Sequence, residues 1–206
     1  SVMRYTKTLL VTAVLASVPM MASAESQFTT GVTTPITASA RVDFTIVVPK
    51  IIYLRVGTGA NLASNAVVDL ITFTVPAASV GNSTPVTGTG GDLTAGVVTA
   101  RVIGNSGIVT LSSTTTGSLT TGVAAEAIPY SQITTTPAVL TSATALAAPA
   151  LASGATTSIT LTPVNRVTNQ DASWTYSFLN SAVVASGTYG GVNVNGSRVT
   201  YTASMP

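Results

Sequence analysis

The chain has 206 residues with only 8 basic and 6 acidic side chains, and it contains no histidine and no cysteine. The absence of both residue types excludes Ser-His-Asp and Cys-His catalysis, metal sites that use His or Cys ligands, and disulfides. Beyond an N-terminal leader the charges balance at six basic and six acidic residues, so the composition does not favour binding to nucleic acid or to an anionic membrane surface.

Residues 1–24 have the pattern of a secretory signal peptide. Arg4 and Lys7 precede an apolar run from Leu9 to Val18, and Ala22-Ser23-Ala24 matches an A-x-A cleavage site. The apolar run is too short to span a membrane, and no later run is long enough to do so. We therefore expect secretion through the periplasm to the cell surface or the medium, with no membrane span.

A long alternating stretch follows the leader, from Phe28 to Val56. Its even positions are nearly all apolar or Thr, whereas the odd positions as far as Thr45 are mostly polar. Strand side chains alternate between two faces, so this pattern predicts strands with one apolar face. The stretch is longer than a normal strand of about 3–10 residues, so we expect it to break or to extend beyond its own domain.

Gly31 and Pro35 interrupt an extended segment, residues 25–37, which precedes a single β-sandwich domain predicted over residues 38–206. The segment is capable of forming a strand but is poorly suited to pairing within its own domain, which makes it a candidate donor strand. Its alternating side chains are Phe28, Thr30, Val32, Thr34 and Ile36. The domain is predicted to open with a strand over Ala38–Val48, followed after Pro49 by a strand over Ile51–Val56.

Several further strands and turns are expected along the domain. A strand is predicted over Val67–Val75, a hairpin between Val97–Ile103 and Ile108–Ser112, a short edge strand over Ile128–Ile133 and another strand over Thr157–Leu161. The Ala-rich residues 137–154 leave two alternatives open, a short helix over Ser142–Ala148 or a crossing loop.

The C-terminal third carries two clear β signals. Trp174, Tyr176 and Phe178 recur at a period of two, which favours a core strand. Asn195-Gly196 lies between two alternating runs, which is a strong hairpin signal. Together the elements predict an all-β fold, an antiparallel Ig-like or pilin-like β-sandwich of eight to ten strands with at most one short helix.

The residues show no catalytic constellation. Lys50 is the only lysine after the leader and follows a strand-ending proline, so we expect it to be solvated. The acidic residues beyond Glu25 are isolated, and the loops around Asp92 and Asp171 each offer one carboxylate, too few for a calcium site. We therefore expect a protein that is not an enzyme and that uses no metal or cofactor.

The cleavable leader, the alternating N-terminal extension, the Thr- and Val-rich strands and the C-terminal Arg198-Val-Thr-Tyr201 strand resemble bacterial donor-strand pilin and fimbrial subunits. The likeness is architectural and covers residues 25–60 and 187–206, and the chain lacks the disulfide that many such subunits have. It implies a sandwich that the extension of a neighbouring subunit completes. The Val42–Gly57 stretch and the C-terminal GTYGG…RVTYTASMP also resemble uncharacterised secreted proteins of Gram-negative bacteria, a likeness that implies no function.

Two functions follow as hypotheses. The first is a structural subunit of a pilus-like filament or surface layer, which self-associates by strand addition with possible help from secretion or assembly partners. The second is a monomeric binding or adhesion module for a carbohydrate or a surface, in which exposed Tyr53, Tyr130 and Tyr189 would line a shallow groove.

Overall fold

The computed structural model describes residues 26–123 and 125–206, so the predicted signal peptide lies outside the described residues. The chain divides into two units, residues 1–48 and residues 49–206. We call residues 26–48 the N-terminal segment and residues 49–206 the sandwich domain. Within the described ranges, no helix is long and apolar enough to cross a membrane.

The sandwich domain is built almost entirely from antiparallel strands, which confirms the all-β prediction. The strands are β1 (Ile52–Val56), β2 (Thr72–Phe73), β3 (Val86–Thr89), β4 (Val97–Gly104), β5 (Val109–Thr115), β6 (Leu119–Thr120), β7 (Ala127–Ile128), β8 (Ile133–Ala138), β9 (Thr156–Leu161), β10 (Thr168–Phe178) and β11 (Val199–Ser204). Two short 3₁₀ turns, η1 (Ala77–Ser79) and η2 (Tyr130–Gln132), are the helical elements of the described residues.

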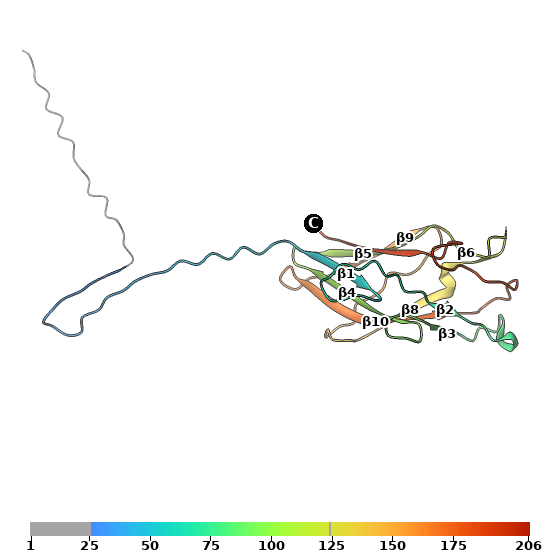
Figure 1. Ribbon diagram of the computed structural model, residues 1–206, viewed down its shortest axis with the longest axis horizontal. Coiled ribbons are helices and arrows are strands. Elements are labelled where there is room, and N and C mark those ends of the chain that lie inside the picture. Colours follow the sequence, from blue (N-terminus) through green and yellow to red (C-terminus); the bar gives the residue numbers. More distant parts are fainter. Residues whose placement is uncertain (1–25, 124) are drawn as a thin grey trace, which may run out of the picture. The chain divides into compact units, whose positions relative to one another are not determined.

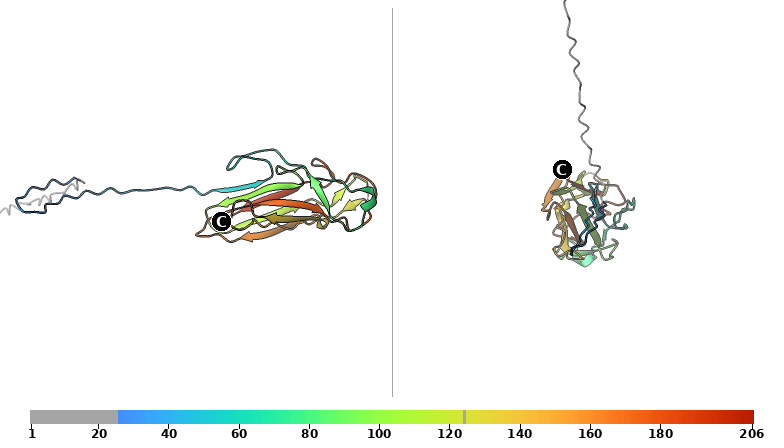
Figure 2. Two further views of the ribbon diagram at one scale, coloured as in Figure 1. Left: turned by 90° about the horizontal axis from the view of Figure 1, so that it is seen from below. Right: turned by 90° about the vertical axis from the view of Figure 1, so that its left-hand side faces the viewer.

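The strands form two main layers (Figures 1 and 2). The first sheet has the order β1-β4-β10-β3-β2, with β8 also paired to β10. The second sheet has the order β11-β5-β9, and β6 and β7 form a separate small ribbon. Both layers contribute to one hydrophobic core.

The register shows that β1 and β2 lie on the same edge of the first sheet. Strand β4 pairs with β10 as far as Thr175, and β3 pairs with the next part of β10, at Ser177 and Phe178. Strand β3 therefore continues the row of β4. Because β1 pairs with β4 and β2 pairs with β3, β2 continues the row of β1. Between them, residues 57–71 leave the sheet.

The core lies between the two sheets and is centred on β10. Trp174, Tyr176 and Phe178 are all buried, which confirms that the aromatic row belongs to the core. The Trp174 indole Nε1–H donates to the Leu146 carbonyl over 2.8 Å, so its polar atom is satisfied in the interior. The other buried apolar side chains are Val98, Ala100, Val102, Val109, Leu111, Ile128, Tyr130, Leu146, Leu151, Leu161 and Ala172.

One side of the sandwich is closed by a crossing segment, residues 139–155, that joins β8 of the first sheet to β9 of the second. It has no helix, so of the two alternatives for this region the structure shows the loop. Leu146 and Leu151 are buried in the core, and the Ser113 hydroxyl of β5 donates to the Ala150 carbonyl over 2.9 Å. The segment thus fills the gap between the sheets with apolar side chains.

Three predicted strands are wrong in whole or in part. Residues 38–48 contain no strand, and the first strand of the described residues is β1. In the predicted Val67–Val75 strand, only the two residues of β2 pair with a neighbour. The predicted edge strand over Ile128–Ile133 is instead the end of β7, the turn η2 and the start of β8.

Two predicted hairpins are also wrong. Strands β4 and β5 do follow one another, but they belong to different sheets, so the residues between them turn a corner of the sandwich. Asn195-Gly196 does form a turn with positive φ at both residues, and Ser197 N–H donates to the Val194 carbonyl over 3.0 Å. However, only the β11 side of that turn is a strand.

Candidate assembly groove

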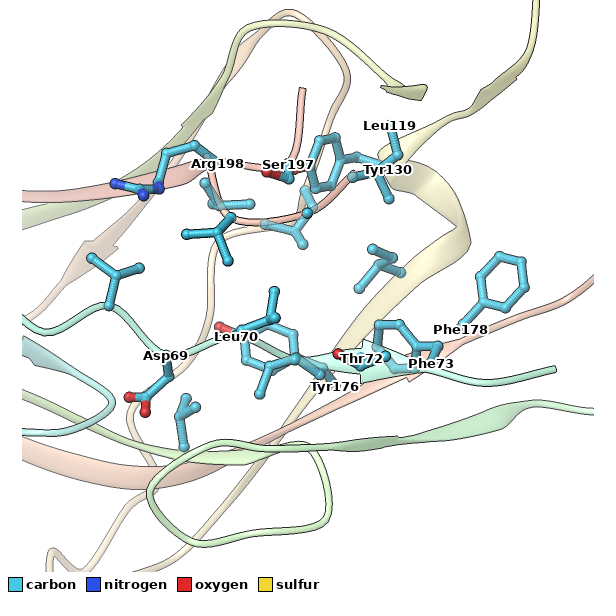
Figure 3. A pocket seen from close by; sticks show the side chains of 18 of the residues that line it. Asp69, Leu70, Thr72, Phe73, Leu119, Tyr130, Tyr176, Phe178, Ser197 and Arg198 are labelled. Carbon is cyan, nitrogen blue, oxygen red and sulfur yellow. The ribbon is translucent and has the colours of Figure 1, made fainter. Parts of the chain in front are cut away.

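The side of the sandwich opposite the crossing segment is open and holds an apolar groove (Figure 3). Its volume is about 1110 Å³, just above the range of roughly 300–1,000 Å³ that small-molecule pockets occupy. We call it the assembly groove. The floor is formed by core side chains that include Val98, Leu151, Tyr176 and Phe178.

Strand β11 forms one wall of the groove. It pairs with β5 on one side only, so its other edge is unpaired within the described sandwich. Val199, Tyr201 and Ala203 alternate as half-buried residues with the exposed Thr200 and Thr202. This wall therefore offers both main-chain hydrogen-bonding groups and an apolar face.

Two tyrosines connect the sheets beneath the groove. The hydroxyls of Tyr176 and Tyr201 are 2.9 Å apart and share a hydrogen bond, and the Tyr201 ring lies 5.3 Å from the Trp174 ring. Burial raises the pKa of Tyr201 to about 12, and it raises the pKa of Tyr176 well above its ordinary value. Both hydroxyls therefore stay neutral, and the floor of the groove remains uncharged.

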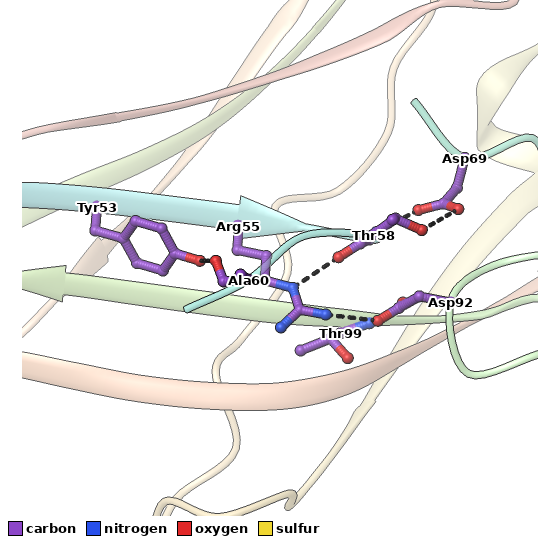
Figure 4. Close-up of polar contacts among 8 residues, drawn as sticks. Tyr53, Arg55, Thr58, Ala60, Asp69, Asp92 and Thr99 are labelled. Atoms are coloured by element: carbon purple, nitrogen blue, oxygen red, sulfur yellow. Dashed lines mark hydrogen bonds and ion pairs between the residues drawn. The ribbon is translucent and has the colours of Figure 1, made fainter. Parts of the chain in front are cut away.

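Residues 57–71 and β2 form the opposite wall, and polar contacts hold the base of this loop (Figure 4). Asp69 accepts hydrogen bonds from the Thr58 N–H over 2.5 Å and from the Thr58 hydroxyl over 2.8 Å. Arg55 donates to the Gly57 carbonyl over 2.7 Å and forms an ion pair of 2.9 Å with Asp92. Gly57 has φ +89°, and a Cβ there would lie 2.0 Å from a carboxylate oxygen of Asp69.

The rim of the groove leaves large apolar side chains exposed. Leu70 is 48% exposed, Val67 59% and Val192 74%. Exposed apolar residues that line one groove make it a candidate interaction site. The groove therefore lacks a covering element.

The N-terminal segment also exposes apolar side chains, in this case along an extended stretch of chain. The candidate donor residues Phe28 and Val32 are 91% and 103% exposed, Ile36 is 52% exposed, and Thr30 and Thr34 are exposed as well. The same holds for its second half, where Phe44 is 88% and Ile46 86% exposed. No strand is assigned anywhere in residues 26–51. The alternation thus continues through the segment without a partner strand among the described residues.

The candidate binding tyrosines all lie in the wall of the groove, but the prediction that they are exposed is wrong for Tyr130, which is buried. Its hydroxyl donates to the Gly196 carbonyl over 2.8 Å. Tyr53 and Tyr189 are half-buried, and their hydroxyls donate to the carbonyls of Ala60 and Ala185. Because each hydroxyl already has a backbone partner, the three rings present mainly apolar surface.

The hypothesis of a binding module places Tyr53, Tyr130 and Tyr189 in a shallow groove, and all three line this one, but the sequence does not predict the two walls. The Val67–Val75 alternation marks an apolar wall, and the Arg198–Tyr201 strand marks the other. That these two segments face one another across a gap follows only from the pairing of β11 and β2 with strands of different sheets. No group of three or more His, Cys, Asp or Glu side chains suited to a metal ion occurs within residues 26–123 and 125–206.

Comparisons with known proteins found no matching family model, no similar curated protein and no similar solved structure. The groove and the N-terminal segment are therefore the features from which function can be inferred.

Proposed function

We propose that this protein is a structural subunit of a filament or surface layer, in which the N-terminal segment of one copy adds a strand to the assembly groove of another. One observation carries the proposal: the described chain contains both an unpaired alternating segment and an apolar groove beside the free edge of β11. In strand addition, main-chain hydrogen bonds supply affinity and alternate side chains enter pockets.

The lack of a strand over residues 38–48 adds a second candidate donor to the one predicted at Phe28–Ile36. In this part of the segment Val42, Phe44, Ile46 and Val48 alternate with Asp43, Thr45 and Val47. At about 3.3 Å per residue, seven residues span about 23 Å, similar to the length of β11. Its side chains are larger than Thr30 and Thr34, so it fills an apolar groove better.

Paired substitutions distinguish the two donors in the secreted chain that begins at Glu25. Phe44→Asn/Ile46→Asn and Val32→Asn/Ile36→Asn each place polar amides at two of the exposed apolar positions. Losing the burial of two apolar side chains costs about 3–6 kcal/mol, or roughly 100-fold to 10,000-fold in the association constant. Sedimentation velocity measures that loss, and we expect it for the Phe44/Ile46 pair. Unchanged association of both variants would contradict the proposal.

The groove is tested separately with Leu70→Arg, which places a charge at its exposed rim. We expect weaker self-association with an unchanged circular dichroism spectrum. Val164→Arg is the matched control, because Val164 is 75% exposed and does not line the groove. Equal association of the two variants would show that the groove is not the acceptor.

The monomeric binding module is less well supported as an alternative. The tyrosine hydroxyls of the groove are already bonded to backbone carbonyls, although other polar side chains, such as Asn65 and Arg198, also line it. We favour strand addition because the same chain carries an exposed apolar segment of the length and pattern that a strand requires. The proposed assembly agrees with the resemblance to donor-strand pilins and is consistent with secretion to the cell surface.

A further inference from the structure

A short joint, residues 49–51, connects the N-terminal segment to β1, and the side chain of Asn105 holds it. The Asn105 Nδ2 donates to the Pro49 carbonyl over 2.8 Å, and the Ile51 N–H donates to Asn105 Oδ1 over 2.8 Å. The last backbone pair of the β1–β4 ladder is Ile52 with Gly104. The amide of Asn105 therefore extends this ladder beyond its end and keeps the joint in line with β1.

The same joint has the sequence of a turn. In Val48-Pro49-Lys50-Ile51, proline occupies the second position, where type I and type II turns favour it. Such a turn would fold the N-terminal segment back along the edge of β1 that is unpaired in the described sandwich, where residues 53–56 line the assembly groove. The hydrogen bond that closes it runs from the Ile51 N–H to the Val48 carbonyl. In the structure that N–H is already bonded to Asn105.

The spacing of apolar residues also makes a hairpin at this turn unfavourable. Leu54 and Val56 are the β1 side chains that pack against the core. A two-residue loop at Pro49-Lys50 pairs Thr45 with Leu54 and Asp43 with Val56, which places a carboxylate on the core face.

A three-residue loop over Pro49–Ile51 would instead place apolar side chains on the core face, because Ile46 then pairs with Leu54 and Phe44 with Val56. The common loop of this length needs its last residue in the left-handed conformation. That residue is Ile51, which is β-branched and strongly disfavours it. Both short hairpins are therefore unfavourable.

We propose that Ile51 and the amide of Asn105 together bar the N-terminal segment from the groove of its own chain, so that the strand that fills the groove comes from a second copy. The inference rests on the proposed function and deepens it, because it explains why the subunit associates with a neighbour and does not complete itself.

The test is Asn105→Ala/Ile51→Gly in the secreted chain, which frees the turn-closing N–H and supplies a residue that adopts the left-handed conformation. Sedimentation velocity compares this variant with the wild type at the same concentration, and we expect the variant to lose the oligomers that the wild type forms. In dilute monomer we expect the amides of residues 42–48 to become protected from hydrogen exchange, whereas those of the wild type exchange freely. Lys50→Gly is the matched control, since it loosens the joint but keeps both residues, and it should behave as the wild type.

A second variant covers the case in which the double variant fails to fold. Ile51→Gly alone retains both hydrogen bonds of Asn105, and we expect it to show partial loss of oligomers and partial protection. If the folded variants associate as the wild type does and residues 42–48 stay unprotected in the monomer, the inference is overturned while the proposed function stands. If the wild type itself sediments as a monomer, the proposed function fails and the inference fails with it.

Discussion

At the scale of single residues, Asp171 shows how an isolated acid can serve structure without catalysis. It is 4% exposed, and its Oδ1 accepts hydrogen bonds of 2.8 Å from the N–H groups of Thr141 and Ser142. The Thr141 hydroxyl also donates to the carboxylate. Burial alone would raise the pKa of Asp171, but these hydrogen bonds outweigh burial and lower it to about 2. The carboxylate thus anchors the start of the crossing segment to β10.

This lowered pKa predicts a loss of stability in acid. The stabilisation by Asp171 is fully present above its unfolded pKa of about 4 and is lost as the pH falls through the folded pKa of about 2. A shift of this size corresponds to about 2 kcal/mol. Urea unfolding followed by the fluorescence of Trp174, the single tryptophan, measures the change.

The control for this prediction is Asp171→Asn, which cannot titrate. We expect it to be less stable than the wild type at neutral pH and to lose less stability on acidification over the same range. Parallel pH profiles for the two proteins would show that another carboxyl group causes the acid sensitivity.

At the scale of elements, the crossing segment and the groove are the two sides of one sandwich, one closed and one open. The crossing segment closes its side because Leu146 is fully buried between the sheets and its carbonyl accepts a hydrogen bond from the Trp174 indole. Leu146→Ala should therefore destabilise the fold by about 2–5 kcal/mol, through lost burial and a residual cavity. Thermal or urea unfolding measures this loss.

Val139→Ala is the matched control in the same segment, because Val139 is 61% exposed. Its effect should stay within about 0.5 kcal/mol. Similar losses for the two variants would mean that the segment lies over the sandwich without closing it.

The sequence predicts the strands of the core far better than it predicts their partners. The row Trp174, Tyr176 and Phe178 and the strand over Thr157–Leu161 are found as expected, because buried strands carry strong local patterns. By contrast, the alternation over Ala38–Val48 shows that one face is suited to burial but not which chain buries it. The turn residues 104–107 likewise fit a hairpin or a sheet-to-sheet corner equally well.

The candidate site could be predicted in part for the same reason. Periodicity gives the apolar face of Phe28, Val32 and Ile36, whereas their exposure and the two walls of the groove depend on long-range pairing. Tyr130 illustrates the limit. A tyrosine beside Pro129 suggests an exposed loop, but its hydroxyl reaches the Gly196 carbonyl, far away in the chain.

At the scale of the whole molecule, the proposed assembly implies that an isolated sandwich with an open groove is an incomplete fold. Filling the groove should stabilise the sandwich domain, because any ligand that binds the folded state but not the unfolded state shifts the equilibrium toward folding. The stabilisation reaches about 2.7 kcal/mol when the ligand is at 100 times its dissociation constant. Stability should therefore rise with protein concentration if neighbouring copies supply the strand.

A peptide of residues 40–49 tests this directly when it is added to the chain without its predicted signal peptide and carrying Phe44→Asn/Ile46→Asn, which is expected to weaken its own segment as a donor. We expect the peptide to raise the unfolding temperature of this variant in a concentration-dependent and saturable way, since it restores the two apolar side chains to the groove. A peptide with the same two substitutions should have no effect, and Leu70→Arg in the protein should weaken the response. An equal rise in the unfolding temperature with both peptides would show that the stabilisation is nonspecific. It would contradict the proposal that this segment binds in the groove.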